Sequence, residues 1–167
     1  MTDTILYRKL TLEDVPMTWA LFKELMTEKA EVSFCEVDSI DHLKEWVNNA
    51  EHLTYVAIDS STGKVVGALR GKRENTEQKR HSVFLTAATL KDYRGHQVAK
   101  KLTEFGLSEM KNEGVKIARI YVYSDNTASL NAVKKLGFEA SGRVVMHHWD
   151  PVCKRFVDDL IFHKKLD

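Results

Sequence analysis

The residues best suited to chemistry form a short turn that leads into a predicted helix. A helix start presents backbone N–H groups without intrahelical partners, at the positive end of the helix dipole, so such a turn can bind phosphate oxygens. Gly95 allows the backbone to approach a ligand closely, and Arg94 or His96 could add positive charge. The turn therefore predicts a pyrophosphate site, with an ordinary helix start as the alternative. Its residues are Arg94, Gly95, His96, Gln97, Val98 and Ala99.

Histidine and cysteine could bind a metal or act as nucleophiles. His147 and His148 are adjacent, and neighbouring residues on a strand point to opposite faces, so we expect them not to share one ion. Cys35 and Cys153 have neither metal-type spacing nor a disulfide framework, and we expect each to be a buried or half-buried thiol. The sequence therefore predicts no metal site and indicates a reducing compartment.

Hydrophobic periodicity and turn residues predict the elements that must position the phosphate-binding turn. The order strand, helix, strand, helix in the second half of the chain favours an α/β fold with a mixed sheet. We expect strands at 5–10, 54–59, 65–70, 82–90, 115–123, 142–148 and 155–163. We expect helices to begin after Thr11, after Asp38 or Ser39, after Gly95 and after Ser124 or Asp125.

The composition fits one globular domain over residues 1–167. Hydrophobic residues make up 43% and charged residues 29%, close to the globular average. Lys plus Arg number 25 and Asp plus Glu 24, so the net charge of +1 indicates neither a nucleic-acid nor a membrane partner. We find no apolar stretch of membrane-spanning length, and the first residues lack the pattern of a signal peptide. We therefore expect a cytoplasmic protein.

The phosphate-binding turn resembles the acetyl-coenzyme A signature of the GCN5-related N-acetyltransferase family, Arg/Gln-x-x-Gly-x-Gly/Ala. Arg94 matches its first position and Ala99 its last, whereas Gln97 stands where relatives have the central glycine. The backbone N–H of Gln97 can still bind phosphate if its side chain points away. A second block, residues 126–138, resembles the family's Asn-x-x-Ala/Ser-x-x-x-x-x-Lys-x-Gly-Phe pattern.

The resemblance implies the acyl-coenzyme A N-acyltransferase fold, a mixed central sheet flanked by helices, with acetyl-coenzyme A as cosubstrate. In relatives the Asn of the second block contacts the pantetheine arm or orders the pocket, a role that falls here to Asn126, with Ser129 beside it. A helix cap is the alternative role for Asn126. A backbone N–H near Thr89 or Leu90 would stabilise the oxyanion when an amine attacks the thioester directly.

The general acid of many relatives is a tyrosine two residues before the Lys of the second block, and this chain has Val133 there. Tyr121 and Tyr123 alternate with Val122, so they share one face of a strand and are candidate substitutes. Core packing is the alternative role for both.

The acceptor implied by the resemblance is a primary amine, and we expect it to belong to a small molecule. In relatives the segment between the first two helices borders the acceptor site, and here it carries carboxylates without a basic residue, so a cationic amine is the hypothesis. Glu31 is a candidate catalytic residue within this segment. Helix-start stabilisation and solvated charges are the alternative. The carboxylates are Glu31, Glu36, Asp38 and Asp41.

Two other functions stay open at this point. A non-catalytic module that binds or senses acyl-coenzyme A would account for Gln97 and Val133, where relatives have glycine and tyrosine. An enzyme that acetylates a protein N-terminus or a lysine would differ only in its acceptor. The oligomeric state is also open, with a homodimer as one candidate.

Overall fold

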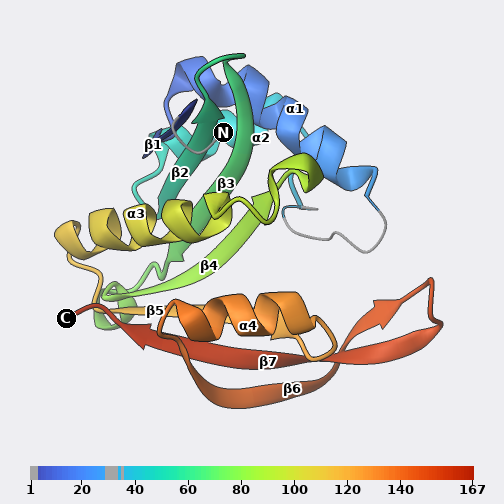
Figure 1. Ribbon diagram of the computed structural model, residues 1–167. Helices are drawn as coiled ribbons and strands as arrows, with labels where there is room; N and C mark the ends of the chain where they lie inside the picture. Colours follow the sequence, from blue (N-terminus) through green and yellow to red (C-terminus); the bar gives the residue numbers. More distant parts are fainter. Residues whose placement is uncertain (1–3, 29–33, 35) are drawn as a thin grey trace.

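A mixed sheet of seven strands organises the chain, of which the computed structural model describes residues 4–28, 34 and 36–167 (Figure 1). The strands lie in the order β1-β2-β3-β4-β5-β7-β6. β4 and β5 are parallel and every other neighbouring pair is antiparallel, which confirms the predicted mixed sheet. The strands are β1 (Ile5–Lys9), β2 (His52–Asp59), β3 (Lys64–Arg73), β4 (Ser82–Thr89), β5 (Ile117–Tyr123), β6 (Glu139–Asp150) and β7 (Arg155–Lys165).

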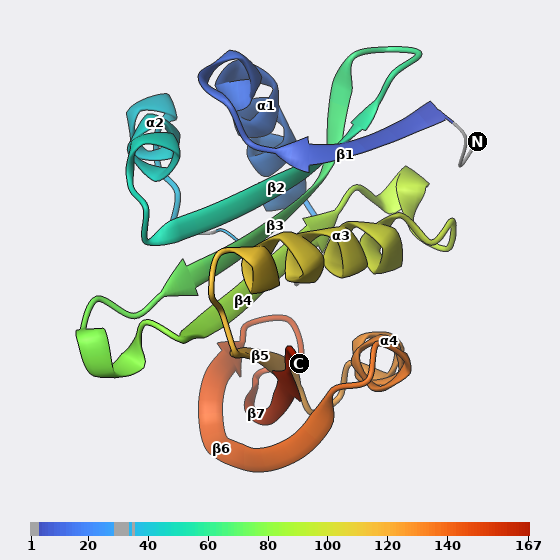
Figure 2. The ribbon, with the colours of Figure 1, turned by 90° about the vertical axis from the view of Figure 1, so that its left-hand side faces the viewer.

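Helices cover both faces of this sheet. Figure 2 shows α1 and α2 on one face and α3 and α4 on the other. In the part of the chain that the structure describes, no helix combines the length and the apolar character needed to cross a bilayer. The helices are α1 (Val15–Met26), α2 (Ile40–Asn48), α3 (Val98–Asn112) and α4 (Thr127–Lys135).

The starts of α1 and α2 follow from short polar side chains. Before α1, the Asp14 carboxylate accepts hydrogen bonds from the Thr11 N–H and hydroxyl, at 3.0 and 2.9 Å. The Ser39 hydroxyl caps α2 by accepting the His42 N–H at 3.3 Å. The Ser39 cap satisfies an N–H group that has no partner within the helix, so α2 begins where the sequence predicts. Thr11 instead begins a 3-10 turn, Leu12–Asp14, and α1 follows that turn at Val15.

Glycines in α3 and β3 leave room for large side chains across the contact between the helix and the sheet. A Cβ placed on Gly106 would lie 2.4 Å from Leu69 Cδ2 and 3.1 Å from Tyr55 Cδ2. A Cβ on Gly67 would lie 3.4 Å from Leu102 Cδ2. This close packing against β2 and β3 fixes the direction of α3, so its N-terminal end sits beside the end of β4.

The parallel strands β4 and β5 pair only over their first halves. Residues 82–85 pair with residues 117–120 in register, and the pairing stops there. Residues 86–89 of β4 and 121–123 of β5 continue as strands beyond that point. The sheet therefore opens between the second halves of β4 and β5, next to the start of α3.

Candidate active site

The N-terminal end of α3 presents backbone N–H groups that no side chain caps within the described part of the chain. The helical ladder begins with the bond from the Lys101 N–H to the Gln97 carbonyl, at 2.9 Å. The N–H groups of Val98, Ala99 and Lys100 precede that bond and point out of the helix end. Together with the helix dipole, they make this end suitable for an anion.

Two left-handed residues shape the turn before α3. Gly95 has φ 79° and Gln97 has φ 64°. Glycine alone adopts this conformation without strain, so Gln97 occupies a position that suits glycine best. The side chains of His96 and Gln97 are exposed, whereas Val98 is buried and offers only its backbone. The structure thus brings the predicted phosphate-binding residues together at one helix end.

The Arg94 guanidinium is held against the end of β4. Its Nε donates to the Thr89 carbonyl at 2.9 Å, and its Nη2 forms an ion pair with the Glu28 carboxylate at 2.5 Å. The Arg94 N–H donates to the Lys91 carbonyl at 3.1 Å. These contacts tie the phosphate-binding turn to β4 and to the segment after α1, and cofactor binding by Arg94 stays a prediction.

The backbone of β4 offers hydrogen-bond donors to the opening beside β5. The Leu90 N–H donates to the Val66 carbonyl at 2.9 Å, so this group belongs to the ladder with β3. Because successive residues of a strand direct their N–H groups to opposite sides, the N–H groups of Ala87 and Thr89 point toward β5, beyond the last paired residue, Leu85. Of the two predicted oxyanion positions, Thr89 has the suitable direction and Leu90 does not.

Asn126 and Ser129 lie at the start of α4, on the β5 side of the opening. The Asn126 Oδ1 accepts the Ser129 N–H at 3.1 Å, so Asn126 caps this helix. The expected cap at Ser124 or Asp125 is wrong, because β5 continues into a turn that places Asn126 at the helix start. The cap role of Asn126 is therefore real, and its contact with a pantetheine arm stays a prediction.

The two candidate tyrosines stand on β5 just beyond the last residue that pairs with β4. Tyr121 and Tyr123 are half-buried and share one face of the strand, as predicted. The Tyr121 ring lies 4.9 Å from the Phe84 ring of β4, measured between centroids. Val133, at the usual tyrosine position of relatives, is buried in the core. Of the three candidate positions, the two on β5 therefore carry a half-buried phenol beside the opening.

A cluster that sequence reasoning missed faces these tyrosines. The expectation that His147 and His148 point to opposite faces is wrong, because the register between β6 and β7 shifts between Val144 and His148. Both imidazoles contact the buried Asp159 carboxylate: His147 Nδ1 lies 2.6 Å and His148 Nε2 3.0 Å from Asp159 Oδ2. A strand bulge leaves no reliable sequence signal here, since neither Val145 nor Met146 is a residue typical of turns.

Two of the carboxylates expected to border the acceptor site, one before α2 and one in its first turn, have basic partners. Glu36 forms an ion pair with Arg70 at 2.5 Å, and Asp41 contacts Lys44 at 3.4 Å. Burial lowers the pKa of Arg70, and the charge of Glu36 opposes that shift. The Arg70 guanidinium also lies 4.1 Å from the Trp46 ring centroid. The ion pair with Arg70 offsets the charge of Glu36, one of the carboxylates on which the cationic-amine hypothesis rests.

Three further residues from the sequence analysis need separate mention. Glu31 and Cys35 lie outside the described residues. Cys153 is exposed, so the expectation of a buried or half-buried thiol is wrong for it. Its N–H donates to the Asp150 carboxylate at 3.1 Å, which holds it in the turn between β6 and β7.

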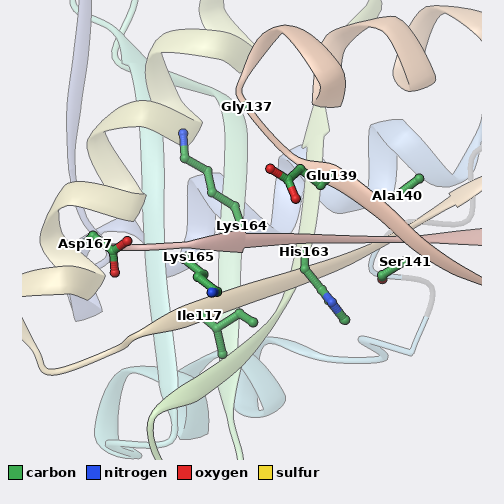
Figure 3. Close-up of a pocket in the computed structure, with 9 residues that line it drawn as sticks. All are labelled: Ile117, Gly137, Glu139, Ala140, Ser141, His163, Lys164, Lys165 and Asp167. Atoms are coloured by element: carbon green, nitrogen blue, oxygen red, sulfur yellow. The ribbon is translucent and has the colours of Figure 1, made fainter.

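A cavity of about 420 Å³ lies elsewhere, at the opposite end of β5 (Figure 3). Its lining includes Ile117, the first residue of β5, and Lys164 and Lys165 near the end of β7. The opening beside β4 begins after Ile120. The cavity is therefore separate from the candidate active site.

The residues beside the opening belong to two different faces of the sheet. Thr89 of β4 pairs with Gly67 of β3, and Gly67 faces α3. The odd-numbered residues of β4 therefore lie on the α3 face of the sheet. Phe84 is on the other face, where its ring meets Tyr121. An anionic carrier bound at the start of α3 could thus extend an acyl group between β4 and β5, and a nucleophile could reach it from the tyrosine side. This arrangement is compatible with the class of acyl-coenzyme A-dependent N-acyltransferases.

Comparison with known proteins specifies the family. Residues 19–138 match the family described as the Acetyltransferase (GNAT) family. The chain belongs to this family, which confirms the predicted fold and makes the protein an acetyltransferase. A sensing module without catalysis thereby loses its support.

The relatives show how far this similarity extends. N-alpha-acetyltransferase 30 of Saccharomyces cerevisiae is 25% identical over 148 residues, which cover 86% of this chain and 81% of the relative. Ribosomal-protein-alanine N-acetyltransferase from Brucella melitensis has a TM-score of 0.82 at 21% identity, covering 96% of this chain and 99% of its own. The putative acetyltransferase yncA from Salmonella typhimurium, solved with acetyl-CoA, has a TM-score of 0.84 at 16% identity. The match covers 98% of this chain and 95% of yncA. At these identities the two structures share the fold.

Proposed function

We propose that this protein transfers the acetyl group of acetyl-coenzyme A to the primary amine of a small molecule. One observation carries the proposal: β4 and β5 part after Leu85 and Ile120, directly beside an uncapped helix start. The parted strands leave backbone donors facing the opening, and the helix end suits the anionic part of the carrier. Family membership supports acetyl-coenzyme A as the carrier.

The pyrophosphate would bind the N–H groups of the turn 95–99 and the start of α3. The exposed side chain of Gln97 does not obstruct this helix end, and a Cβ on Gly95 would meet no atom within 4 Å. The acyl arm would then follow β4 into the opening, where Asn126 and Ser129 border it from the α4 side. Every group of the proposed cofactor site except the Arg94 side chain acts through the backbone or a short polar side chain.

In the proposed reaction, an amine nitrogen attacks the thioester carbonyl carbon directly. The C–N bond forms as the carbonyl π electrons move to oxygen, where the Thr89 N–H would stabilise the negative charge. The C–S bond then breaks and the sulfur takes a proton, for which Tyr123 or Tyr121 is the proposed donor. Both tyrosines lie on the face from which the acceptor would enter.

A second acceptor class has its own support. The relative from Saccharomyces cerevisiae is named an N-alpha-acetyltransferase, which suggests acetylation of a protein N-terminus. The ion pair between Glu36 and Arg70 weakens the case for a strongly cationic small molecule. A small amine remains our first proposal, and a protein N-terminus is the second candidate.

Thiol release from acetyl-coenzyme A tests these alternatives. The acceptors would be neutral and cationic small amines, and short peptides with free or blocked N-termini, each measured against hydrolysis without acceptor. Higher kcat/KM for small amines supports the first proposal, and higher values for free-N-terminal peptides select the second. Release that no amine accelerates above hydrolysis would overturn the transferase proposal.

Two properties from the sequence analysis complete the proposal. We propose a cytoplasmic location, which the absence of a disulfide framework in the sequence supports. We also propose that catalysis needs no metal, because a direct attack requires only an oxyanion donor and proton transfer.

A further inference from the structure

The bulge in β6 places two imidazoles on one carboxylate. Val144 pairs with Asp159 and His148 pairs with Val157, so three residues of β6 lie opposite a single residue of β7. Met146 adopts φ 51° within this bulge. The Asp158 carboxylate braces it by accepting the Met146 N–H at 2.8 Å.

An ion pair stabilises Asp158 in this position. Asp158 forms an ion pair with Arg143 at 2.5 Å. The hydrogen bond from the Met146 N–H, followed by that from Arg143, lowers the pKa of Asp158. The Asp158 carboxylate therefore stabilises the bulge by accepting the Met146 N–H. The bulge in turn sets the direction of the His147 and His148 side chains.

Asp159 is the buried centre of the cluster. Its side chain is 3% exposed, whereas those of His147 and His148 are 41% and 37% exposed. Each imidazole contacts the Asp159 carboxylate through one ring nitrogen, Nδ1 of His147 and Nε2 of His148. An imidazole that donates its N–H to a carboxylate keeps its other nitrogen as an acceptor. Asp159 Oδ1 is buried and has no hydrogen-bond partner among the described residues.

The cluster borders the opening between β4 and β5. The His148 ring lies 4.7 Å from the Tyr123 ring, and the His147 ring lies 6.0 Å from the Tyr121 ring, measured between centroids. Asp159 is also the register partner of Tyr123 on β5. The titratable groups that face the imidazoles are therefore Asp159 of β7 and the two tyrosines of β5, with the Arg143–Asp158 ion pair beside them.

We propose that His147 and His148, oriented by Asp159, are the general base that removes protons from the attacking amine. This inference rests on the proposed function and assigns the general base of that reaction. A neutral imidazole takes one proton from the ammonium form of the acceptor, which frees the nitrogen lone pair for attack on the carbonyl carbon. After the C–N bond forms, the nitrogen loses a second proton, the thiolate leaves with one proton, and the other passes to water.

The exposure of the two rings suits this proton balance. One net proton must leave the site in each turnover, and partly exposed imidazoles can pass it to solvent. Asp159 acts as a positioning residue, because it contacts the imidazoles and not the amine. A carboxylate that orients an imidazole in this way is a recurring feature of general-base catalysis.

The pH dependence of turnover tests the proposal. We expect kcat of the unaltered chain to rise with pH across the range in which imidazoles titrate. In a His147→Gln, His148→Gln double variant, kcat should fall about 100-fold, and the rise should move toward about pH 10, where amines lose their own proton. Affinity for coenzyme A, measured by calorimetry, should not change. His81→Gln, which removes an exposed imidazole outside the site, is the matched control.

The outcomes separate this inference from the function on which it rests. A double variant that folds, binds coenzyme A and keeps the pH profile overturns the base and leaves the transferase in place. Absence of acetyl transfer by the unaltered chain overturns both. Loss of activity with a chelator, restored by Zn²⁺ alone, would show a metal site instead and also overturn the base. Asp159→Asn should shift the profile in the same direction as the double variant, because the amide cannot hold both rings in the required tautomers.

Discussion

Single residues at the start of α3 decide whether an anion can bind there. The carrier site is built from backbone N–H groups, so a substitution acts through the space and charge that it adds and through backbone strain. Gly95 and Gln97 both adopt left-handed conformations, which an L side chain adopts at a cost of about 1–2 kcal/mol. Variants at these positions therefore need controls that carry the same strain elsewhere.

Gly95→Glu should abolish measurable binding of coenzyme A, because it adds a negative charge and a side chain where the pyrophosphate would lie. Isothermal calorimetry measures the affinity. Gly114→Glu is the matched control, since Gly114 has φ 88°, lies at the other end of α3, and a Cβ added there would meet no atom within 4 Å. The control should share the loss of stability and keep the affinity. Equal affinities in both variants would disprove the placement of the carrier.

Gln97→Gly should preserve or tighten binding of coenzyme A, because it relieves strain and removes only an exposed side chain. The free energy of unfolding should change by less than about 1 kcal/mol, since glycine also makes the unfolded chain more flexible. Lys154→Gly, at φ 50° in the turn between β6 and β7, is the control for strain relief alone. A tenfold loss of affinity confined to Gln97→Gly would show that its side chain contacts the carrier.

At the scale of elements, α2 packs on β2 around a half-buried histidine, His52. The His52 ring stacks on Trp46 with centroids 5.5 Å apart and planes 7° apart. Burial lowers the pKa of His52 to about 4, and the charges of Arg70, Lys72 and His42 add to the shift. The contact between α2 and the sheet is therefore sensitive to acid.

Stability should consequently fall as pH decreases from about 6.5 to about 4. The unfolded chain binds a proton at His52 in this range and the folded chain does not, so protons favour unfolding. The contribution of His52 is about 1 kcal/mol, because water screens a half-exposed ring. His52→Phe keeps the stack and should flatten this part of the profile, measured by urea unfolding at several pH values. Identical pH slopes in the variant and the unaltered chain would contradict this assignment.

The sequence predicts elements better than it predicts the contacts between them. Strand and helix positions follow from local periodicity, and the phosphate-binding turn is visible because Gly95 and the helix that follows are adjacent in the chain. The cluster around Asp159 depends on a register shift between two strands, which is a property of their pairing. Leu90 shows the same limit, because only the pairing with β3 reveals that the Val66 carbonyl occupies its N–H.

The whole molecule consists of two half-sheets that share few backbone bonds. β1 to β4 form one antiparallel group and β5 to β7 form the other. Among the described residues, the strand pairing between the two groups is confined to residues 82–85 and 117–120. In Figure 1, α3 covers the first group and α4 lies along the second. A carrier bound in the opening would contact both groups, so binding should stabilise the molecule as a whole.

Coenzyme A should therefore raise the thermal stability and protect specific amides from hydrogen exchange. At a concentration 100 times Kd, binding contributes about 2.7 kcal/mol, which corresponds to a rise in Tm of about 5–10 °C for a chain of this size. Mass spectrometry or NMR should show slower exchange at Ala87 and Thr89, whose N–H groups face the opening. Val83, whose N–H lies within the paired half of β4, should change less, because the ladder with β5 already protects it. Protection confined to the start of α3, with Ala87 and Thr89 unchanged, would mean that the carrier binds by its phosphates alone and does not enter the opening between the strands.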